Sequence, residues 1–508
     1  MSGAQGSYRS GMNALGRIKL ADDNTEFPAV RRNEGYLDLR ELIERFDEMG
    51  ELARVDGADW NLEIGALSET IAAADPGRAK ALLFDNIPGY PEGFRIMSGA
   101  ANAYKRLAVV LGMPDPENEM DLVKAYRKRA KKDFELMPPV EVPTGPVMEN
   151  IDRDDEVDLL KFPVPFVHEK DGGRYIGTDD LVVMRDPDSG WVNVGTYRVM
   201  VHDKNTAAIW MSPGKHGRLI SEKYFAKGEP CPVVISCGHD PNLFLVAHQE
   251  VDYELDEFAY AGGQRGRPIE VILSELHGLP IPAYSELVLE GEIMPDETRE
   301  EGPFGEFMGY YASEASVLPV VRIKRVYWRN NPILTLAVPS RPPENFTFAR
   351  ATVKSAMIWD EMEKAGVPGV EGVWCHESGA GRLFNVVSIK QLYPGHATQA
   401  GMLAATCHAG NYAGRWVVVV DEDIDPSNLF DVTWAMSTRC DPPEDIQYIK
   451  RAWSTPLDPM LRAPPWQNNR AVVDACRPYA WKDDFPTVAE ASPELKASIR
   501  GKWPELYE

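Results

Sequence analysis

Residues 181–201 read LVVMRDPDSGWVNVGTYRVMV, and this stretch indicates the fold of the middle of the chain. Two runs of apolar and β-branched residues, 181–185 and 191–201, flank an Asp-Pro-Asp-Ser-Gly sequence at 186–190 that is typical of a turn. Many short strands with few helices predict a β-barrel or a closed sheet. Runs of the same kind recur at 231–236, 243–247, 269–273, 286–292, 318–328 and 333–338.

On either side of this region, the pattern changes to helices that alternate with buried strands. A helix is expected at 37–49, because Asp38 and Glu41 have the spacing of a capping box and one apolar stripe follows them. A charged helix is expected near 120–132, and 416–420 is the clearest buried strand towards the C-terminus. Both ends of the chain are therefore predicted to be α/β.

Prolines between residues 138 and 146, followed by an acidic stretch at 152–158, mark a boundary between two of these regions. We therefore predict an α/β multidomain (α+β) chain. Its units would be an N-terminal α/β domain at 1–140, a central split β-barrel at 148–335, a C-terminal α/β oligomerisation domain at 340–475, and a tail at 476–508 that would wrap a neighbouring subunit.

Composition narrows the function further. The chain has 508 residues, 44% of them hydrophobic, which favours two or three domains. Its formal net charge of −24 would repel phosphate backbones and anionic lipid, so we expect neither nucleic acid nor membrane as a partner. The sequence shows no signal peptide or membrane span, and its six cysteines include no CxxC pair. These features predict a cytoplasmic protein with reduced thiols.

The segment Glu301-Gly-Pro-Phe-Gly-Glu306 is the most suggestive local feature. A Gly-Pro-Phe-Gly turn between two carboxylates can direct both side chains into one pocket, where unequal surroundings can separate ion pairing from proton transfer. The alternative is a solvated acidic loop, because Arg299 and Glu300 precede the motif.

Asn193 and Arg198 both lie on a strong strand signal. An arginine that points inward from an apolar strand needs an anionic partner, whereas one that points outward is an ordinary surface charge. The two residues are an odd number of positions apart, so an unbroken strand would place them on opposite faces. We expect either a bulge near Gly195 or contacts with different parts of one ligand.

His216 and Glu257 are further polar candidates. His216 follows Pro-Gly-Lys in a loop, and Glu257 is one of several acids that begin a helix. Together with Asn193 they would suit Mn²⁺ or Mg²⁺. Each also has a simpler explanation, as a structural histidine and a solvated acid, and no HxxxH or CxxC spacing supports a metal independently. Cys375-His376 and Cys407-His408 are poor nucleophile pairs, because adjacent side chains point apart.

Taken in order, these segments resemble the UbiD family of prenylated-FMN-dependent (de)carboxylases, in the branch that acts on aromatic and heteroaromatic acids. The resemblance spans roughly residues 35–470. The segments are specific for this family as an ordered set, because SELVLEGE and EGPFGE follow each other closely. The set comprises Thr178, RDPDSGWVNVGTYR ending at Arg198, SPGKH at His216, DEF and AGG around Glu257, SELVLEGE at Glu286, EGPFGE at 301–306, and VVVVDEDIDP near the C-terminus.

The resemblance implies a site as well as a fold. The central barrel would bind the flavin, Arg198, Glu301 and Glu306 would form the catalytic group, and Phe307 would be an aromatic wall of the substrate pocket. Asn193, His216 and Glu257 would hold Mn²⁺ (or Mg²⁺), with K⁺ as an additional ion. One departure is Arg415, which stands where many members carry a lysine. The implied cofactor contacts are Thr178, Asn193, Thr196, Tyr197, Arg198, Lys215, His216, Glu257 and Arg415.

The implied activity is a reversible, non-oxidative decarboxylation of an aromatic or heteroaromatic acid. Prenylated FMN would be the covalent electron sink, and Glu306 the proton donor. A flavin prenyltransferase would supply the cofactor, and the protein would be a homodimer or a higher homo-oligomer. Two alternatives remain at this point. A non-catalytic flavin-binding or assembly subunit would bind cofactor without turnover, and a metal-dependent hydrolase built on Asn193, His216 and Glu257 would turn over without flavin.

Overall fold

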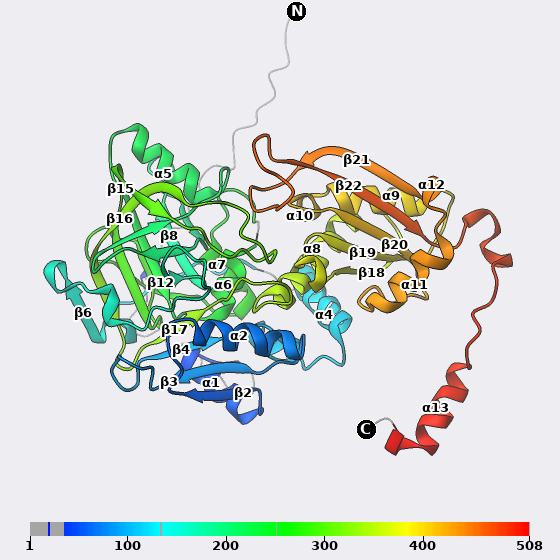
Figure 1. Ribbon diagram of the computed structural model, residues 1–508, viewed down its shortest axis with the longest axis horizontal. Helices are drawn as coiled ribbons and strands as arrows, with labels where there is room; N and C mark the ends of the chain where they lie inside the picture. Colours follow the sequence, from blue (N-terminus) through cyan, green and yellow to red (C-terminus); the bar gives the residue numbers. More distant parts are fainter. Residues whose placement is uncertain (1–18, 21–34, 133–134, 250, 507–508) are drawn as a thin grey trace, which may run out of the picture.

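The computed structural model describes residues 19–20, 35–132, 135–249 and 251–506. The N-terminal and central parts of the chain lie together in Figure 1, and most of the C-terminal part lies beyond α8 (Thr347–Lys364). Within the described residues the strands form sheets of four, nine, four and five members, so the fold is mixed α/β and multidomain, as predicted. No helix in these ranges is long and apolar enough to cross a membrane.

Helix α1 (Leu39–Glu48) confirms the first expected helix. The Asp38 carboxylate accepts hydrogen bonds from the backbone N–H groups of Arg40 and Glu41, both at 3.0 Å. In the capping box that we expected, the Glu41 carboxylate would accept from the Asp38 N–H. It accepts instead from the Leu37 N–H, at 2.6 Å. The expected apolar stripe is buried: Leu39, Leu42, Ile43 and Phe46.

The N-terminal sheet has the order β17-β4-β3-β2. Its strand β17 (Ile333–Leu336) runs parallel to β4 (Arg95–Ser98), although we expected residues 333–338 in the central sheet. All residues of β17 are buried, which suits a parallel strand covered on both faces. The other elements are β2 (Leu52–Asp56), β3 (Ala81–Asp85), α2 (Glu63–Ala74), α3 (Tyr104–Val110) and α4 (Glu119–Lys132).

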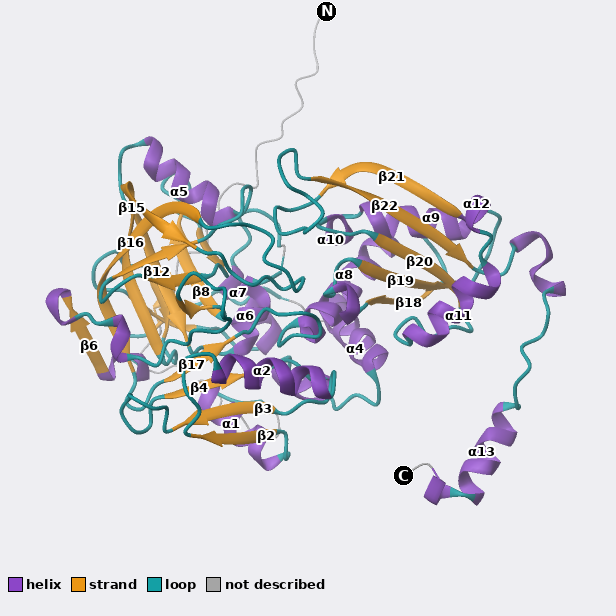
Figure 2. Ribbon diagram, in the orientation of Figure 1, coloured by secondary structure: helices purple, strands orange, loops and turns teal. Residues whose placement is uncertain are grey.

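The central sheet has the order β7-β10-β11-β16-β15-β12-β8-β9 and curls into a half-barrel (Figure 2). Its longest strands, β15 (Leu287–Glu301) and β16 (Ser316–Trp328), pair antiparallel, and β6 (Asn150–Arg153) adds to β16. The others are β7 (Arg174–Gly177), β8 (Asp180–Arg185), β9 (Val192–Gly195), β10 (Val199–Val201), β11 (Thr206–Ile209) and β12 (Cys231–Cys237). A small sheet joins β1 (Lys19–Leu20), β5 (Val140–Glu141), β13 (Glu270–Leu273) and β14 (Pro280–Pro282).

One expected strand is wrong. Residues 243–247 belong to helix α6 (Pro241–Ala247), not to the sheet. The Asp240 carboxylate caps this helix by accepting from the Asn242 backbone N–H at 3.0 Å, and a proline occupies the first helical position. A short apolar run carries no periodicity that separates strand from helix, so the Asp-Pro start was the informative signal.

The C-terminal sheet has the order β18-β19-β20-β22-β21, and β20 (Trp416–Asp421) confirms the strand expected at 416–420. The tail ends in α13 (Pro493–Lys502), which has no buried residue and lies away from the rest of the chain in Figure 1. The other elements here are β18 (Val370–Cys375), β19 (Phe384–Ile389), α9 (His396–Thr406), α10 (His408–Asn411), α11 (Leu429–Arg439), α12 (Pro442–Asp445), β21 (Ile446–Trp453) and β22 (Gln467–Ala475).

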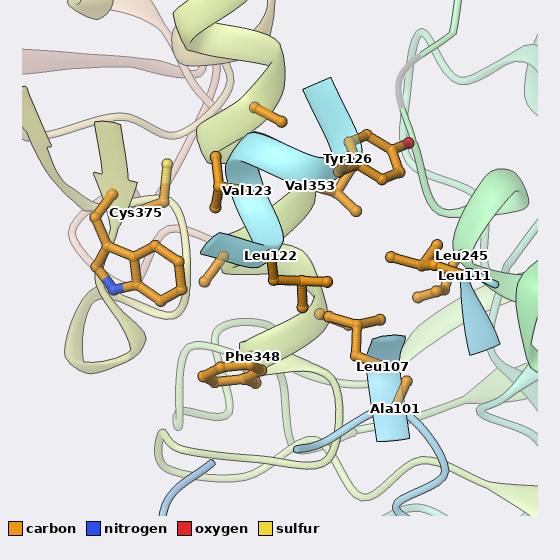
Figure 3. Close-up of a cluster of buried hydrophobic side chains, with 14 of the residues drawn as sticks. Ala101, Leu107, Leu111, Leu122, Val123, Tyr126, Leu245, Phe348, Val353 and Cys375 are labelled. Carbon is orange, nitrogen blue, oxygen red and sulfur yellow. The ribbon is translucent and has the colours of Figure 1, made fainter. Parts of the chain in front are cut away.

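One buried hydrophobic cluster joins the three parts of the chain (Figure 3). It includes Leu122 of α4, Leu245 of α6, Phe348 of α8 and Cys375 of β18. Separating the parts would expose this apolar surface to water, so they are held as one unit around the site. Burial also raises the pKa of the Cys375 thiol to about 12, which argues against a catalytic Cys375-His376 pair.

Candidate functional site

A cavity of about 360 Å³ lies between the central half-barrel and the C-terminal part of the chain. Trp210 and Phe304 line one part of it, and Arg382, Tyr412 and Trp453 approach from the C-terminal part. A concave site built from two parts of a chain is the usual setting for a ligand. Most predicted site residues line it: Thr178, Asn193, Thr196, Tyr197, Arg198, Lys215, His216, Glu257, Glu306 and Phe307.

Arg198 is the buried centre of the site. Its Nε and Nη2 donate to the two carboxylate oxygens of Glu301 at 2.8 and 2.9 Å, and its Nη1 donates to Glu306 Oε1. The Tyr175 hydroxyl donates to Glu301 Oε1 at 2.8 Å, and the guanidinium lies 4.7 Å from the ring centroid of Trp210. Arg198 therefore points inward and is not a surface charge.

The carboxyl group of Glu306 is suited to holding a proton. Burial raises its pKa from the ordinary 4.5 to about 7; the Arg198 guanidinium opposes this rise, and the negative charge of Glu301 adds to it. Glu301 is fully buried, so the EGPFGE segment is not the solvated acidic loop that remained an alternative. A carboxyl group with a pKa near neutrality can exist in both protonation states under ordinary conditions.

The backbone turns sharply between Asn193 and Arg198, which explains how both reach one cavity. Strand β9 ends at Gly195, and β10 begins only at residue 199. A Cβ atom on Gly195 would lie 2.6 Å from the Tyr197 hydroxyl oxygen, so this approach requires glycine. The Thr196 hydroxyl donates to Asp180 Oδ1 at 3.2 Å and holds the turn. We expected either a bulge near Gly195 or contacts with different parts of one ligand; the structure shows that the strand ends at Gly195.

The proposed metal ligands come from three separate elements. Asn193 lies in β9, His216 is the first residue of α5 (His216–Ala226), and Glu257 is the first residue of α7 (Glu257–Arg265). Burial raises the pKa of Glu257 to about 8, although the Val194 N–H donates to its Oε2 at 3.1 Å. Burial and the Lys215 charge lower the pKa of His216, which favours the neutral imidazole that binds metals.

The chemistry of these three side chains fits a divalent ion, since an amide oxygen, a neutral imidazole and a carboxylate all line one cavity. A nearby cation would stabilise the charged form of the buried Glu257 carboxylate. Across the described ranges, no group of three or more His, Cys, Asp or Glu side chains is placed to hold a metal ion. This set contains only two side chains of those types, and its third member is an asparagine.

Arg415, which we expected to contact the cofactor, forms an ion pair with Asp458 in this structure. Its Nη2 donates to both carboxylate oxygens of Asp458 at 2.6 Å, and it is not among the residues that line the cavity. Asp458 also accepts from the Ser454 hydroxyl at 3.1 Å. Because residues 454–457 line the cavity, Arg415 supports a wall of the site through Asp458, and its contact with the cofactor stays a prediction.

Two cationic residues of the cavity wall were not found from the sequence. Arg350 of α8 lies 4.5 Å from the ring centroid of Phe307 and donates to Glu344 Oε1 at 3.0 Å. Arg382 lies 6.0 Å from the same ring and 4.9 Å from that of Tyr412. The sequence around Arg382, Ser-Gly-Ala-Gly-Arg, could have drawn attention to it as a polar segment at the end of a buried strand.

Models of known protein families match most of this sequence. The N-terminal, Rift-related and C-terminal domain models of 3-octaprenyl-4-hydroxybenzoate carboxy-lyase match residues 43–126, 139–342 and 347–475. The chain belongs to the UbiD family. The matched models and the decarboxylase relatives are carboxy-lyases. The predicted family and the predicted enzyme class, a carboxy-lyase, are both confirmed.

Individual relatives agree with the family models. This UbiD-family chain is 34% identical over 446 residues to pyrrole-2-carboxylic acid decarboxylase of Pseudomonas aeruginosa, covering 85% of this chain and 88% of that protein. The vanillic acid decarboxylase of Sedimentibacter hydroxybenzoicus, in an open form with truncated ShVdcD, superposes with a TM-score of 0.81 at 29% identity. That alignment covers 94% of this chain and 100% of the other.

A third similar protein was solved with flavin. The UbiD-class enzyme HmfF from Pelotomaculum thermopropionicum, in complex with FMN, superposes with a TM-score of 0.80 at 28% identity, covering 91% of this chain and 98% of that one. An evolved dimeric form of HmfF in complex with prFMN has a TM-score of 0.76 at 28% identity, with coverages of 90% and 98%.

Proposed function

We propose that this UbiD-family enzyme catalyses the reversible, non-oxidative decarboxylation of an aromatic or heteroaromatic acid with prenylated FMN, and that Glu306 is the proton donor. The observation that carries the proposal is the position of Arg198, which forms ion pairs with both Glu301 and Glu306 at the wall of one cavity. Decarboxylase relatives support the reaction class, and the flavin complexes of HmfF support the cofactor.

The walls of the cavity support a flat, aromatic substrate. Trp210, Phe304 and Phe307 line it close to Glu306. Aromatic side chains favour aromatic ligands through stacked and edge-to-face contacts. The relatives named for pyrrole-2-carboxylic acid and vanillic acid are consistent with this substrate class.

Each member of the catalytic group has its own role in the proposal. Arg198 orients the carboxylate of the substrate, and Glu301 holds Arg198 through two hydrogen bonds and offsets its charge. Glu306 delivers a proton to the carbon that loses carbon dioxide, so one proton replaces one carboxylate group. The raised pKa of Glu306, about 7, keeps a large fraction of it protonated near neutrality.

Cofactor and metal would be held by the residues predicted for them. Asn193, His216 and Glu257 would bind Mn²⁺ or Mg²⁺, and K⁺ is an additional candidate ion. Thr178, Thr196, Tyr197 and Lys215 would contact the flavin, and the metal ion and the Lys215 ammonium would neutralise negative charge on it. When bound, the prenylated flavin supplies the electron sink that the loss of carbon dioxide from an unsaturated carbon requires.

The tail supports a proposal that the protein is a homo-oligomer. Helix α13 carries Leu495 and Ile499 four residues apart, and Trp503 follows them. All three side chains are exposed in the described chain, and four-residue spacing places the first two on one helix face. We expect a second copy of the chain to cover this face.

A panel assay tests the proposed function. The protein would be co-expressed with a flavin prenyltransferase, purified, and given benzoic, pyrrole and furan carboxylic acids with and without hydroxyl groups. We expect bound prenylated FMN and release of carbon dioxide from at least one acid. Bound flavin with no release from any acid would favour an assembly or binding subunit, and turnover by flavin-free protein would favour a metal-dependent hydrolase.

A further inference from the structure

A buried aspartate joins the segment before β7 to the loop that carries Glu306. The side chain of Asp171 is fully buried, and its Oδ1 accepts hydrogen bonds from the Gly305 N–H at 3.1 Å and the Tyr311 hydroxyl at 3.2 Å. Its Oδ2 accepts from the His168 N–H at 3.1 Å. One carboxylate therefore holds both sides of residue 306, through donors that lie more than 130 residues away in the sequence.

Backbone contacts reinforce this junction. The Gly172 N–H donates to the Pro303 carbonyl at 2.7 Å. A Cβ atom on Gly172 would lie only 1.9 Å from the Gly302 carbonyl oxygen, so the two segments approach as closely as they do because residue 172 is glycine. Asp171 and Gly172 thus both fit against the loop at 302–311.

We infer that Asp171 is a positioning residue for proton transfer, which holds the loop at 302–311 so that Glu306 lies against Arg198 in the cavity. The inference rests on the proposed role of Glu306 as proton donor. A simple turn-capping role would require only the contact with His168. A turn cap does not need the two contacts with the loop at 302–311, one of which is made by Gly305, directly before Glu306, and the other by Tyr311, five residues after it.

The charge of Asp171 also acts on the donor. Glu306 faces Arg198, which lowers its pKa, and Glu301 and Asp171, which both raise it. Around Asp171 itself are Tyr311 and the His168 ring, whose Nδ1 lies 3.5 Å from Oδ2. The far side of that ring faces Glu69, with 3.7 Å between Nε2 and the Glu69 carboxylate. Replacing the Asp171 carboxylate by an amide should therefore lower the pKa of Glu306.

Three variants separate these effects. Asp171→Asn keeps an oxygen for Gly305 and Tyr311 but removes the charge, Asp171→Ala removes both, and Tyr311→Phe removes one contact with Asp171 intact. We expect Asp171→Ala to lower kcat about 100-fold with little change in KM, the size expected when a catalytic group is misplaced by about 1 Å. Asp171→Asn should shift the basic limb of the kcat pH profile to lower pH. Asp155→Asn, at an exposed position, is the matched control and should change neither kcat nor its pH profile.

Hydrogen exchange of the peptide that spans 302–311 tests the inference without turnover. Faster exchange at Gly305 in Asp171→Ala than in Asp155→Asn supports it, whether or not any acid is decarboxylated. Exchange equal to the control overturns it, as would an Asp171→Asn enzyme with unchanged kcat and an unchanged pH profile. If Asp171→Ala does not fold, Asp171→Asn and Tyr311→Phe decide by the same two readouts. Absence of turnover in the unsubstituted protein would count against the proposed function only.

Discussion

Arg198 and Glu301 are 103 residues apart in the sequence, yet two of the guanidinium nitrogens of Arg198 donate to the two carboxylate oxygens of Glu301 at 2.8 and 2.9 Å. This two-point contact offsets the charge of Arg198 before Glu306 is considered. Glu306 receives a single contact from Nη1 of the same guanidinium. With only one contact to the guanidinium, the buried Glu306 carboxyl group can keep a proton near neutrality, because burial raises its pKa to about 7.

Removing the acid function of Glu306 should slow turnover strongly. Because general acid catalysis contributes about 10²–10⁴-fold, Glu306→Gln is expected to lower kcat by at least about 100-fold, with flavin content unchanged. Carbon dioxide release and the absorbance of bound flavin measure the two quantities. Glu300→Gln, on an exposed neighbour, is the control and should retain activity. Near-full activity of Glu306→Gln would remove the proton-donor assignment.

The pH dependence of decarboxylation should follow Glu306. Its pKa is about 7 and its acid form is the active one, so kcat/KM is expected to fall as the pH rises above about 7. Measuring kcat/KM from pH 5.5 to 9 with a stable substrate tests for this decrease above pH 7. A decarboxylation rate that rises through neutrality would contradict the assignment.

The same pKa predicts a change in stability. A carboxyl group whose folded pKa is raised from 4.5 to about 7 contributes stability that is fully present below 4.5 and is lost as the pH rises through about 7. Glu306→Gln removes this contribution. Relative to the unsubstituted protein, the Tm of Glu306→Gln should therefore be higher at pH 8 than at pH 5. An equal Tm difference at both pH values would indicate that Glu306 is ionised in the folded protein throughout.

Arg198 should not be replaceable by lysine. Lysine keeps the charge but is a point charge that cannot donate to Glu301 at two points in the geometry of a guanidinium. We expect Arg198→Lys to lower kcat/KM at least about 100-fold. Arg299→Lys, which alters an exposed ion pair with Asp203, is the matched control and should have little effect. Equal kinetics in the two variants would show that the geometry of Arg198 is unimportant.

Metal and flavin should be lost together. Glu257→Gln removes the carboxylate from the proposed ligand set, so we expect less bound divalent metal by elemental analysis and less bound flavin by absorbance. Dialysis against a chelator should have the same effect, reversed by Mn²⁺ or Mg²⁺. Glu254→Gln, at an exposed position three residues earlier, is the control and should retain both metal and flavin. A Glu257→Gln protein with full metal and flavin would contradict the ligand assignment.

The tail should contribute to assembly. Deleting residues 478–508 removes α13, with its exposed Leu495 and Ile499, and the exposed Trp503 that follows it. If a second copy covers this face, light scattering should give fewer subunits per particle for the truncated protein. Alternatively, its oligomer should dissociate at a higher protein concentration than that of the full chain. An unchanged assembly over a dilution series would show that the tail does not hold subunits together.

Sequence patterns predicted the fold where local signals and packing agree. Helix α1 was predictable because its cap and its buried stripe coincide, and β20 because five consecutive apolar residues leave no polar face. Residues 243–247 were misassigned because five apolar residues fit either structure, and the deciding cap lies outside the run. The place of β17 beside β4 depends on contacts between distant segments, which periodicity does not report.

The site shows the same division. Arg198, Glu301 and Glu306 were predictable because their motifs occur together in a fixed order, and the structure brings them into direct contact. The ion pair of Arg415 with Asp458 could not be predicted, because Asp458 lies in a loop that no motif marks. Arg350 and Asp171 carry no local signal of their roles. An arginine in a helix and an Asp-Gly-Gly turn are ordinary sequence features, and only the folded chain places them beside residues 305–307.

The most direct test of the account is a single turnover of the protein loaded with prenylated FMN, carried out in deuterium oxide with an aromatic or heteroaromatic acid that it binds. We expect one carbon dioxide per product and one deuterium at the carbon that carried the carboxylate, in the unsubstituted enzyme but not in Glu306→Gln. Deuterated product formed at the same rate by Glu306→Gln would contradict the role of Glu306. No carbon dioxide from the loaded, unsubstituted protein with any acid would contradict the proposed function itself.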